Sequence, residues 1–313
     1  MRFGCDCSDL DARTSPFGRP RCPIRVFPFL CRARDGGENR ASNIVEAGVT
    51  VARTIAFANQ KGGVAKTTST LAVGAALAQM GSRTLLVDLD PQGCLSFSLG
   101  VDVEQLDLTI HDVLVGRVPV GKTIHQLSEV DLVPANIDLA GAEAYLLMRT
   151  GREYSLRASL EDVQMHYDWV LLDCPPSLGV LTINALTAAD GVIIPMQCEA
   201  LSHRGVGQLL ETINDVHRLT NKNLEIIGIL PTMFDSRTAH AQQILSDVGR
   251  RYHLNLLEPP IKKSIRFAEA PAWGRSIIKF APHHPGAEAY RHIARSLLDA
   301  ANAATAQQNA AGD

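Results

Sequence analysis

The stretch Ala58-Asn-Gln-Lys-Gly-Gly-Val-Ala-Lys-Thr-Thr68 decides the expected fold of this 313-residue chain. It follows a short apolar run, Thr54-Ile-Ala-Phe57, and precedes an Ala/Leu-rich stretch from Ser69 to Met80 with helical spacing. A strand, a glycine turn and a helix start form the context in which backbone N–H groups bind phosphate. We therefore predict a phosphate-binding loop at residues 58–68.

Single residues of this loop match roles in binding a nucleoside triphosphate. Gly62 and Gly63 lack a Cβ, so the backbone can approach the anion closely. Lys66 is placed to reach the β- and γ-phosphates, and the Thr67 hydroxyl is placed to hold Mg²⁺. The alternative interpretation is a glycine-rich turn that binds nothing.

The loop departs from the general pattern G-x-x-x-x-G-K-[ST], because Gln60 and Ala65 stand where glycines are expected. It offers instead a second lysine, Lys61, at the head of the turn. Lys-Gly-Gly-x-x-Lys-Thr-Thr resembles the deviant Walker A motif of the ParA/MinD group of ATPases. The resemblance implies that Lys61 acts in catalysis beside Lys66, by reaching across a dimer interface to the partner's nucleotide. It also implies a set of nucleotide-binding residues, which are Lys61, Gly62, Gly63, Val64, Ala65, Lys66, Thr67 and Thr68.

Two aspartates end the next apolar run, Arg83-Thr-Leu-Leu-Val-Asp-Leu-Asp90. A continuous apolar run suits a parallel strand that is covered on both faces. Asp88 and Asp90 then lie at the carboxyl end of that strand, where open α/β sheets bind ligands. A strand-capping Asp-Pro turn is the plainer alternative. Asp-x-Asp-Pro-Gln is similar to switch I of the ParA group, which implies that Asp90 orients the attacking water. We therefore count Asp90 among the candidate catalytic residues and also among the candidate metal-binding residues.

A third motif, Tyr167-Asp-Trp-Val-Leu-Leu-Asp173-Cys-Pro-Pro-Ser177, has the form of a Walker B strand and switch II. Its Asp173 would hold the Mg²⁺ shell through water. A core strand with a capping aspartate is the alternative, although Asp-x-Pro-Pro-Ser is again similar to the ParA group. The later stretch from Pro231 to Thr238 resembles the segment of that family beside the adenine base, which implies contacts from Pro231 and Met233.

The alternation of strands and helices predicts an α/β fold with a doubly wound, mostly parallel sheet flanked by helices. The resemblance covers roughly residues 53–299. We expect an ATPase domain at 51–302, a polar C-terminal tail at 303–313 and a separate extension at 1–50. No apolar run approaches the roughly 20 residues that a membrane span needs.

Residues 1–50 hold four of the seven cysteines, Cys5, Cys7, Cys22 and Cys31, and no lysine. No strand or helix period persists there. We interpret the segment as a disordered extension, or as translation from a start upstream of the native one. The alternative is a four-cysteine metal site, but the spacing C-x-C…C-x8-C lacks the paired C-x2-C arrangement typical of zinc.

Binding to nucleic acid would need a local basic patch, because the net charge of −3 gives no general attraction. Between Arg204 and Lys279 there are eleven Lys/Arg against seven Asp/Glu. The family resemblance implies non-specific binding of double-stranded DNA through phosphate contacts. An ordinary solvated face is the alternative. The candidate DNA-binding residues are Arg218, Arg250, Arg251, Lys262, Lys263 and Arg266.

The motifs predict an ATPase that uses ATP and Mg²⁺, and the resemblance implies that it is cytoplasmic, associates with the nucleoid and forms a homodimer with ATP. The resemblance implies a role in chromosome or plasmid segregation with a ParB-like partner. A scaffold ATPase that positions a partner complex without touching DNA is one alternative. A MinD-like membrane switch is another, but it needs a basic amphipathic C-terminal helix, whereas residues 296–313 are rich in Ala, Gln and Asn.

Overall fold

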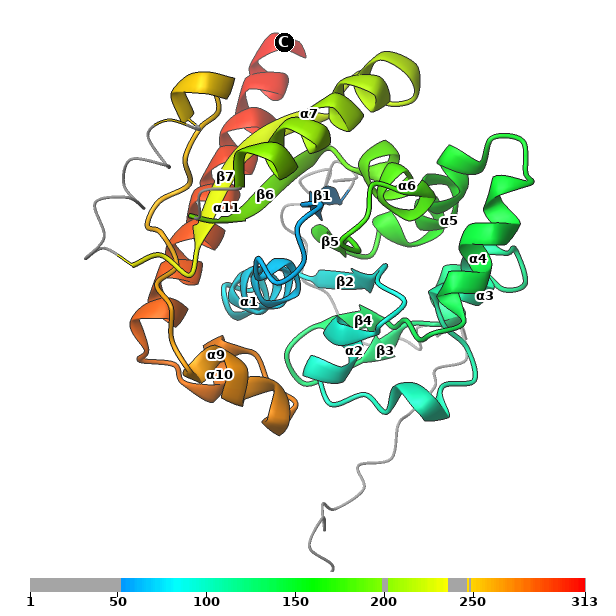
Figure 1. Ribbon diagram of the computed structural model, residues 1–313, viewed down its shortest axis with the longest axis horizontal. Coiled ribbons are helices and arrows are strands. Elements are labelled where there is room, and N and C mark those ends of the chain that lie inside the picture. The colour runs from blue at the N-terminus through cyan, green and yellow to red at the C-terminus, as the bar shows by residue number, and fades with distance from the viewer. Residues whose placement is uncertain (1–51, 199–201, 236–246, 248, 313) are drawn as a thin grey trace, which may run out of the picture.

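A seven-stranded sheet organises the computed structural model, which describes residues 52–198, 202–235, 247 and 249–312 (Figure 1). The strand order is β3-β4-β2-β5-β1-β6-β7, and every neighbouring pair is parallel except β3 and β4. This confirms the predicted doubly wound, mostly parallel sheet. The strands are β1 (Arg53–Phe57), β2 (Thr84–Asp88), β3 (His125–Gln126), β4 (Asp131–Val133), β5 (Trp169–Asp173), β6 (Gly191–Gln197) and β7 (Glu225–Thr232).

Helices cover both faces of the sheet (Figure 1). One layer contains α1, α10 and α11, and the other contains α3 to α7. The expected extension at 1–50 lies outside the described residues. The helices are α1 (Lys66–Gln79), α2 (Cys94–Ser98), α3 (Ile110–Leu114), α4 (Leu139–Leu147), α5 (Ser155–Gln164), α6 (Val180–Ala188), α7 (Ser202–Leu219), α9 (Arg266–Glu269), α10 (Ile277–Phe280) and α11 (Pro285–Gly312).

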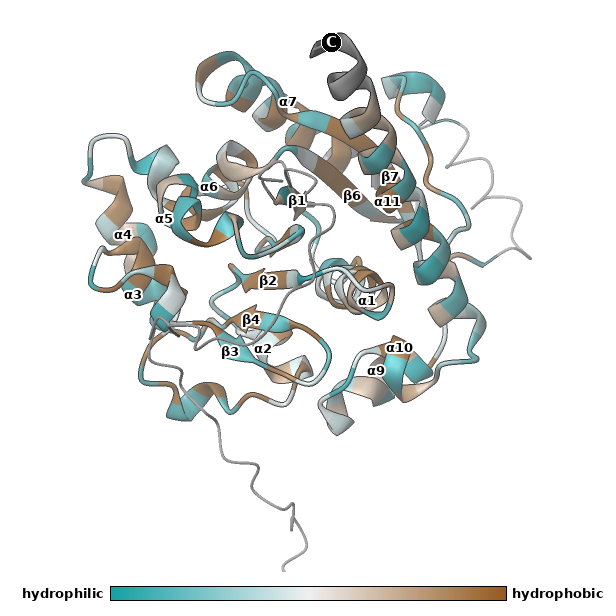
Figure 2. Ribbon diagram, turned by 180° about the vertical axis from the view of Figure 1, so that it is seen from behind, coloured by the Kyte–Doolittle hydropathy of each residue, from teal (hydrophilic) through white to brown (hydrophobic). Residues whose placement is uncertain are grey.

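The strands divide the core into two clusters, because successive side chains of a strand point to opposite faces. Leu85 and Val87 of β2 pack with the α3–α7 layer, whereas Leu86 between them packs with α1 and α11. The central parts of the strands are accordingly hydrophobic, whereas many polar residues lie on the outer helix surfaces (Figure 2). Such continuous burial is what the unbroken apolar runs of the sequence predict for a parallel sheet.

The register of the central strands brings three loops to one edge of the sheet. Phe57 pairs with Asp173, and Asp88 pairs with Asp173 from the other side. The carboxyl ends of β1, β2 and β5 are therefore level. The loop after β1 leads into α1, which begins at Lys66 instead of the expected Ser69.

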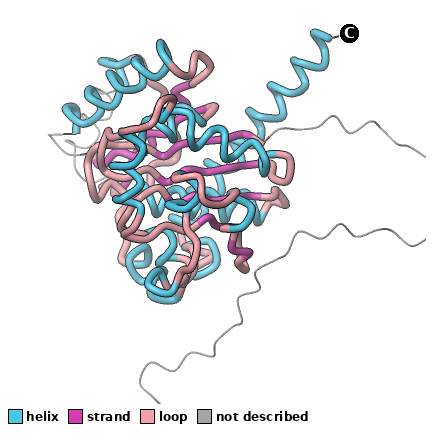
Figure 3. The backbone as a smooth tube through the Cα atoms, turned by 90° about the vertical axis from the view of Figure 1, so that its right-hand side faces the viewer, coloured by secondary structure: helices cyan, strands magenta, loops and turns pink. Residues whose placement is uncertain are grey.

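Helix α11 links the C-terminal part of the chain to the phosphate-loop helix. Its Tyr290 is fully buried, and the Tyr290 hydroxyl lies 2.9 Å from Ser69 Oγ on α1. The helix continues through the polar residues 303–312 and projects away from the sheet (Figure 3). Among the helices that the structure describes, none is both long enough and apolar enough to cross a bilayer.

A glycine in β7 allows a late segment of the chain to pair with the sheet edge. The Leu257 N–H donates to Ile229 O at 2.8 Å, and the Ile229 N–H donates to Asn255 O at 2.8 Å. At Gly228, a Cβ would lie only 2.7 Å from Asn255 O, which is a backbone atom. The next part of this segment stays beside β7, because the Ile261 N–H donates to Pro231 O at 2.8 Å.

We expect Gly228→Ala to lower the free energy of unfolding by about 1–3 kcal/mol, because the new Cβ forces two backbone segments apart. Urea unfolding of purified protein measures the change. Gly141→Ala is the matched control, since its Cβ would meet its nearest atom, His111 Cε1, at 3.7 Å. That control lies inside α4 and should be neutral or slightly stabilising. Equal stability of both variants would contradict the role given to Gly228.

Candidate active site

The loop after β1 has the backbone of a phosphate cradle. Gly63 has φ of 72° and Ala65 has φ of 64°, so both lie in the left-handed region. For Ala65 this conformation costs roughly 1–2 kcal/mol, since its Cβ approaches the following carbonyl. The alanine that departs from the general motif thus adopts the conformation that a glycine would supply. At Gly62, by contrast, an added Cβ would only touch Pro176 Cβ at 3.8 Å.

Lys66 is the first residue of α1 and is 7% exposed. Its Nζ donates to Lys61 O at 3.3 Å, which folds the side chain back over the loop. Burial lowers the pKa of Lys66, while the nearby Asp173, Cys174 and Asp90 oppose that change. The ammonium therefore sits between the loop and the carboxylates, where a phosphate chain on the loop would meet it.

The structure separates the roles of the two aspartates that end β2. Asp88 is fully buried, and its Oδ2 accepts from Ser96 N at 2.9 Å and from Ser96 Oγ at 2.8 Å. Its Oδ1 accepts from Asp90 N at 3.1 Å, and burial raises the pKa of Asp88 to about 6. Asp90 is only half-buried, accepts from Gln92 N at 2.9 Å and lines the cavity described below. Asp88 thus holds the turn together, and Asp90 is the carboxylate that a ligand can reach.

Asp173 ends β5 and is fully buried. Thr70 Oγ1 donates to its Oδ1 at 3.3 Å. Burial and the neighbouring Asp88 raise the pKa of Asp173 well above its usual value, and the Thr67 hydroxyl partly offsets this rise. The second oxygen of Asp173, Oδ2, has no hydrogen-bond partner among the described residues. An unpartnered buried carboxylate oxygen beside a threonine hydroxyl fits the outer shell of Mg²⁺.

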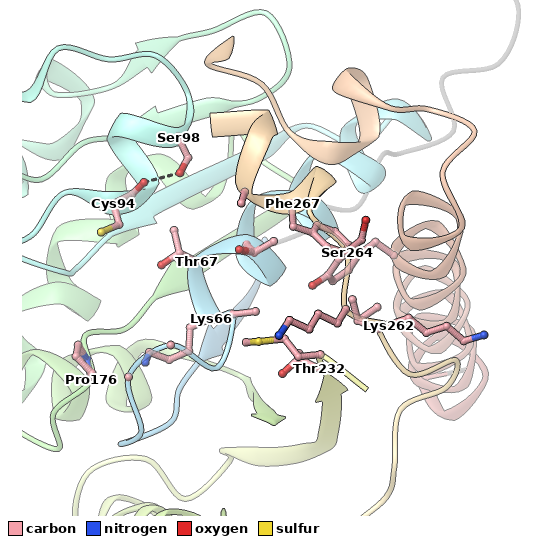
Figure 4. Close-up of a pocket in the computed structure, with 18 of the residues that line it drawn as sticks. Lys66, Thr67, Cys94, Ser98, Pro176, Thr232, Lys262, Ser264 and Phe267 are labelled. Carbon is pink, nitrogen blue, oxygen red and sulfur yellow. Dashed lines mark hydrogen bonds between the residues drawn. The ribbon is translucent and has the colours of Figure 1, made fainter. Parts of the chain in front are cut away.

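Three of these residues, Lys66, Thr67 and Asp90, open into one cavity of about 510 Å³, whereas Asp88 and Asp173 are not among the described residues that line it. Lys66, Thr67 and Asp90 line its phosphate-loop end, and Met233, Ser264 and Phe267 line the other end. Figure 4 shows Ser264, Phe267 and Lys262 on one side, Cys94 and Ser98 on the opposite side, and Thr67 between them. The cavity thus combines the phosphate loop and Lys66 on one side with an aromatic ring, a hydroxyl and two further lysines, Lys262 and Lys263, on the other.

Only some of the predicted nucleotide-binding residues line the cavity. Gly62, Gly63, Ala65 and Thr68 line it in addition to Lys66 and Thr67. Lys61, Val64 and Pro231 are not among the described residues that line it. Val64 is buried instead, and its carbonyl accepts from Thr232 Oγ1 at 3.0 Å.

The six predicted DNA-binding residues fall into three groups. Lys262 and Lys263 are exposed but line the cavity itself. Arg251 lies over the ring of Tyr252, 5.6 Å from its centroid. The remaining three arginines each form an ion pair with a nearby acid, which lowers their local excess of charge. These pairs are Arg218–Asp215 at 2.9 Å, Arg250–Asp247 at 3.2 Å and Arg266–Glu269 at 2.8 Å.

Sequence reasoning missed the cavity residues Cys94, Ser98, Ser264, Phe267 and Tyr290. They come from α2, from the segment before and within α9, and from α11. The sequence carries one usable signal for Ser264 and Phe267, because the stretch Ile261-Lys-Lys-Ser-Ile-Arg-Phe-Ala-Glu-Ala-Pro271 resembles a late segment of partition proteins of the ParA group. The position of Ser264 and Phe267 in the cavity wall depends on the backbone pairing of this segment with β7, which the sequence alone does not show.

Comparison with known proteins gives consistent results. A family model described as "AAA domain" matches residues 52–226. Sporulation initiation inhibitor protein Soj of Bacillus subtilis is 42% identical over 247 residues, with 78% of this chain and 98% of Soj covered. Chromosome partitioning protein ParA of Myxococcus xanthus is 41% identical over 251 residues, with 80% and 89% covered.

A solved structure shows the same architecture. It is described as cobyrinic acid a,c-diamide synthase from Mycobacterium smegmatis with bound ADP and magnesium. Its sequence is 52% identical, its TM-score is 0.72, and the match covers 79% of this chain and 94% of that one. The likeness therefore extends over most of this chain.

We expect Asp88→Ala and Asp90→Ala to differ in stability. Asp88→Ala leaves the buried N–H and hydroxyl of Ser96 without an acceptor and should lower the free energy of unfolding by about 2–4 kcal/mol. Asp90→Ala loses one exposed turn contact and should lower it by less than about 1 kcal/mol. Thermal unfolding distinguishes them, since each kcal/mol moves the Tm by roughly 2–4 °C in a domain of this size. Equal Tm values for the two variants would contradict the assignment of Asp88 as the structural residue.

Proposed function

The chain belongs to the AAA-domain family and is a P-loop ATPase of the ParA/Soj type, and on this basis we propose that it acts in chromosome or plasmid segregation. In this proposal two protomers dimerise with ATP and Mg²⁺, and the dimer binds double-stranded DNA without sequence preference. A ParB-like partner stimulates hydrolysis, which releases the dimer from DNA. The protein would then be associated with the nucleoid.

The observation that carries the proposal is the different placement of two lysines on one loop. Lys66 lines the cavity, whereas Lys61 is not among the described residues that do so. The Lys61 Cβ instead lies 4.0 Å from the position of a Cβ on Gly205, near the start of α7. Lys61 thus stands at the start of the phosphate loop, while Lys66 is the lysine that lines the cavity of the same protomer. This placement supports a contact between Lys61 and the nucleotide of a second copy.

The chemistry follows from the cavity residues. The backbone N–H groups of the loop and the Lys66 ammonium bind the β- and γ-phosphates, where their charge offsets that of the phosphates. Thr67 and Asp173 are the residues that would hold Mg²⁺. Mg²⁺ held there would supply positive charge that offsets the charge developing on the phosphates. Asp90 already accepts from Gln92 N through Oδ1, and its carboxylate can accept from and orient a water for attack on the γ-phosphate.

Amidation of cobyrinic acid is a second candidate function, because the Mycobacterium smegmatis structure with that description is 52% identical. Relatives at 41–42% identity carry the names Soj and ParA, which favours segregation. ATP consumption that depends on cobyrinic acid and an ammonia donor would support the amidation reaction. ATP consumption that rises with a ParB-like protein and DNA would support the partition reaction.

We expect the two lysines to separate nucleotide binding from dimerisation. Lys66→Ala should weaken nucleotide binding on the order of 100-fold, because a charge-assisted contact to phosphate is lost. Lys61→Ala should keep monomer affinity but prevent the ATP-dependent dimer. Calorimetry with a non-hydrolysable ATP analogue and light scattering of the same samples measure both effects. Normal dimerisation of Lys61→Ala would rule out the role across the interface.

We expect Asp90→Ala to bind ATP, stop hydrolysis and persist as a dimer that holds DNA. Gel retardation of unrelated duplexes with ATP, beside size-exclusion chromatography, measures both properties. Binding should weaken steeply with salt, since phosphate contacts release counterions. A trapped dimer that ignores DNA at low salt would overturn the segregation proposal and favour a scaffold ATPase.

The surface that binds DNA is tested in this trapped background with charge reversals outside the cavity. Arg218→Glu, Arg250→Glu and Arg251→Glu together should release DNA while nucleotide binding and the dimer remain. The matched control reverses the same number of exposed charges on another face, at Lys122, Arg149 and Arg157. Equal DNA binding by both triple variants would exclude this surface. Charge reversal of Lys262 and Lys263 must be accompanied by a measurement of nucleotide affinity, because both residues line the cavity.

A further inference from the structure

The cavity side remote from Lys66 carries the hydroxyl group of Ser264. Figure 4 shows Ser264 there with the aromatic ring of Phe267 and with Lys262. The cavity lining also includes the apolar side chains of Met233 and Ala268. Flat apolar surface of this kind suits a nucleobase, whereas the triphosphate belongs with the loop and Lys66. The hydrogen-bonding direction of Ser264 therefore determines which atoms of a base can face it.

A histidine from the start of α11 fixes that direction. The Gly286 N–H donates to His284 Nδ1 at 2.9 Å, so this nitrogen must be an acceptor and carries no proton. The neutral ring then carries its proton on Nε2, which lies 3.0 Å from Ser264 Oγ. His284 is consequently the donor in this pair, and Ser264 Oγ is the acceptor.

A second donor also occupies the Ser264 oxygen, since the Arg266 N–H donates to it at 3.3 Å. With His284 Nε2–H and Arg266 N–H both donating to Oγ, the acceptor capacity of the hydroxyl is filled. The remaining hydrogen-bonding function of Ser264 is its own O–H proton. Because Ser264 lines the cavity, this proton is available to an acceptor atom of a bound ligand.

Two other hydroxyl groups of the cavity wall already donate their protons to backbone carbonyl groups. Ser98 Oγ donates to Cys94 O at 2.7 Å, which is the hydrogen bond drawn in Figure 4. Thr232 Oγ1 donates to Val64 O at 3.0 Å. Ser264 differs from both, because its partners donate to it.

Aromatic packing holds the Ser264–His284 pair in place. The Phe267 ring meets the His284 ring edge-on at 5.9 Å and the Tyr290 ring edge-on at 6.0 Å. A Cβ on Gly286 would lie 2.5 Å from Phe267 Cζ and 3.0 Å from His284 Nδ1, so only glycine fits there without displacing these side chains. The direction of the Ser264 proton is thus set by rigid neighbours.

We propose that Ser264 donates its hydroxyl proton to a ring nitrogen of the purine base, and that His284 is the positioning residue that imposes this direction. A purine offers such an acceptor at N1 (adenine), N3 or N7 without rearrangement of the site. Ser264 is thereby a specificity-determining residue of the ATPase. The inference concerns the nucleotide site alone and does not depend on DNA binding or on the partner.

The test measures which ring nitrogen matters. Affinities of the full chain for ADP and for 1-deaza-, 3-deaza- and 7-deaza-ADP, each with Mg²⁺, are compared by calorimetry. One analogue should bind roughly 3- to 10-fold more weakly than ADP, the range expected for one neutral hydrogen bond. Ser264→Ala should bind ADP more weakly by that factor and no longer distinguish the analogue. Ser264→Thr keeps the hydroxyl and should keep the discrimination.

Ser98→Ala is the matched control, because it removes a serine hydroxyl from the same cavity whose proton is bonded to a backbone carbonyl. It should retain the wild-type discrimination among the analogues. The proposal fails if wild type binds all three deaza analogues as tightly as ADP, or if Ser264→Ala discriminates as wild type does.

The tautomer of His284 provides a measurement on the unmodified protein. Long-range ¹H–¹⁵N NMR of the histidine rings should show a protonated Nε2 and an unprotonated Nδ1 for His284. His284→Phe keeps a ring against Phe267 but removes the donor, so discrimination among the analogues should fall toward that of Ser264→Ala. A protonated Nδ1 in wild type, or full discrimination in His284→Phe, would overturn the positioning role.

Discussion

Two buried carboxylates at adjacent strand ends constrain the rest of this structure. The register of the sheet pairs Asp88 with Asp173, and both side chains are fully buried. Burial raises the pKa of both carboxyls, and the neighbouring Asp88 raises that of Asp173 further, so the pair needs donors and cations nearby. Ser96 and Thr70 supply hydrogen bonds, and Lys66 supplies a charge. A bound metal ion completes the same balance, which is why the site lies at this edge of the sheet.

The sequence predicted those parts of the site that are local in the chain. A strand, a loop and a helix that follow one another place Lys66 and Thr67 at the start of the helix, independently of how the rest of the chain folds. The wall formed by Ser264 and Phe267 could not be predicted in that way. It depends on a hydrogen bond from Ile261 N to Pro231 O and on a histidine from α11, and no periodicity in the sequence encodes these contacts.

Two details show how far residue identity and conformation can diverge. Ala65 departs from the expected glycine in sequence but adopts the left-handed backbone of one, so the motif is preserved at a cost in strain. Asp88 and Asp90 are equivalent in a motif search, yet Ser96 binds one and the cavity receives the other. Only the family resemblance, and not the residues themselves, pointed to Asp90 before the structure was considered.

The basic residues of the late segment connect the two proposed ligands of the protein. Lys262 and Lys263 line the nucleotide cavity, while Arg266 in the next turn is held by Glu269. A nucleotide in the cavity draws on the same positive charge that a DNA phosphate would use, and Coulomb interactions at such short range are weakly screened. If DNA binds at this segment, its affinity must therefore depend on the bound nucleotide through direct electrostatics. Coupling of this kind requires no conformational change that is transmitted through the sheet. The exposed arginines outside the cavity would contribute DNA affinity that does not depend on the bound nucleotide.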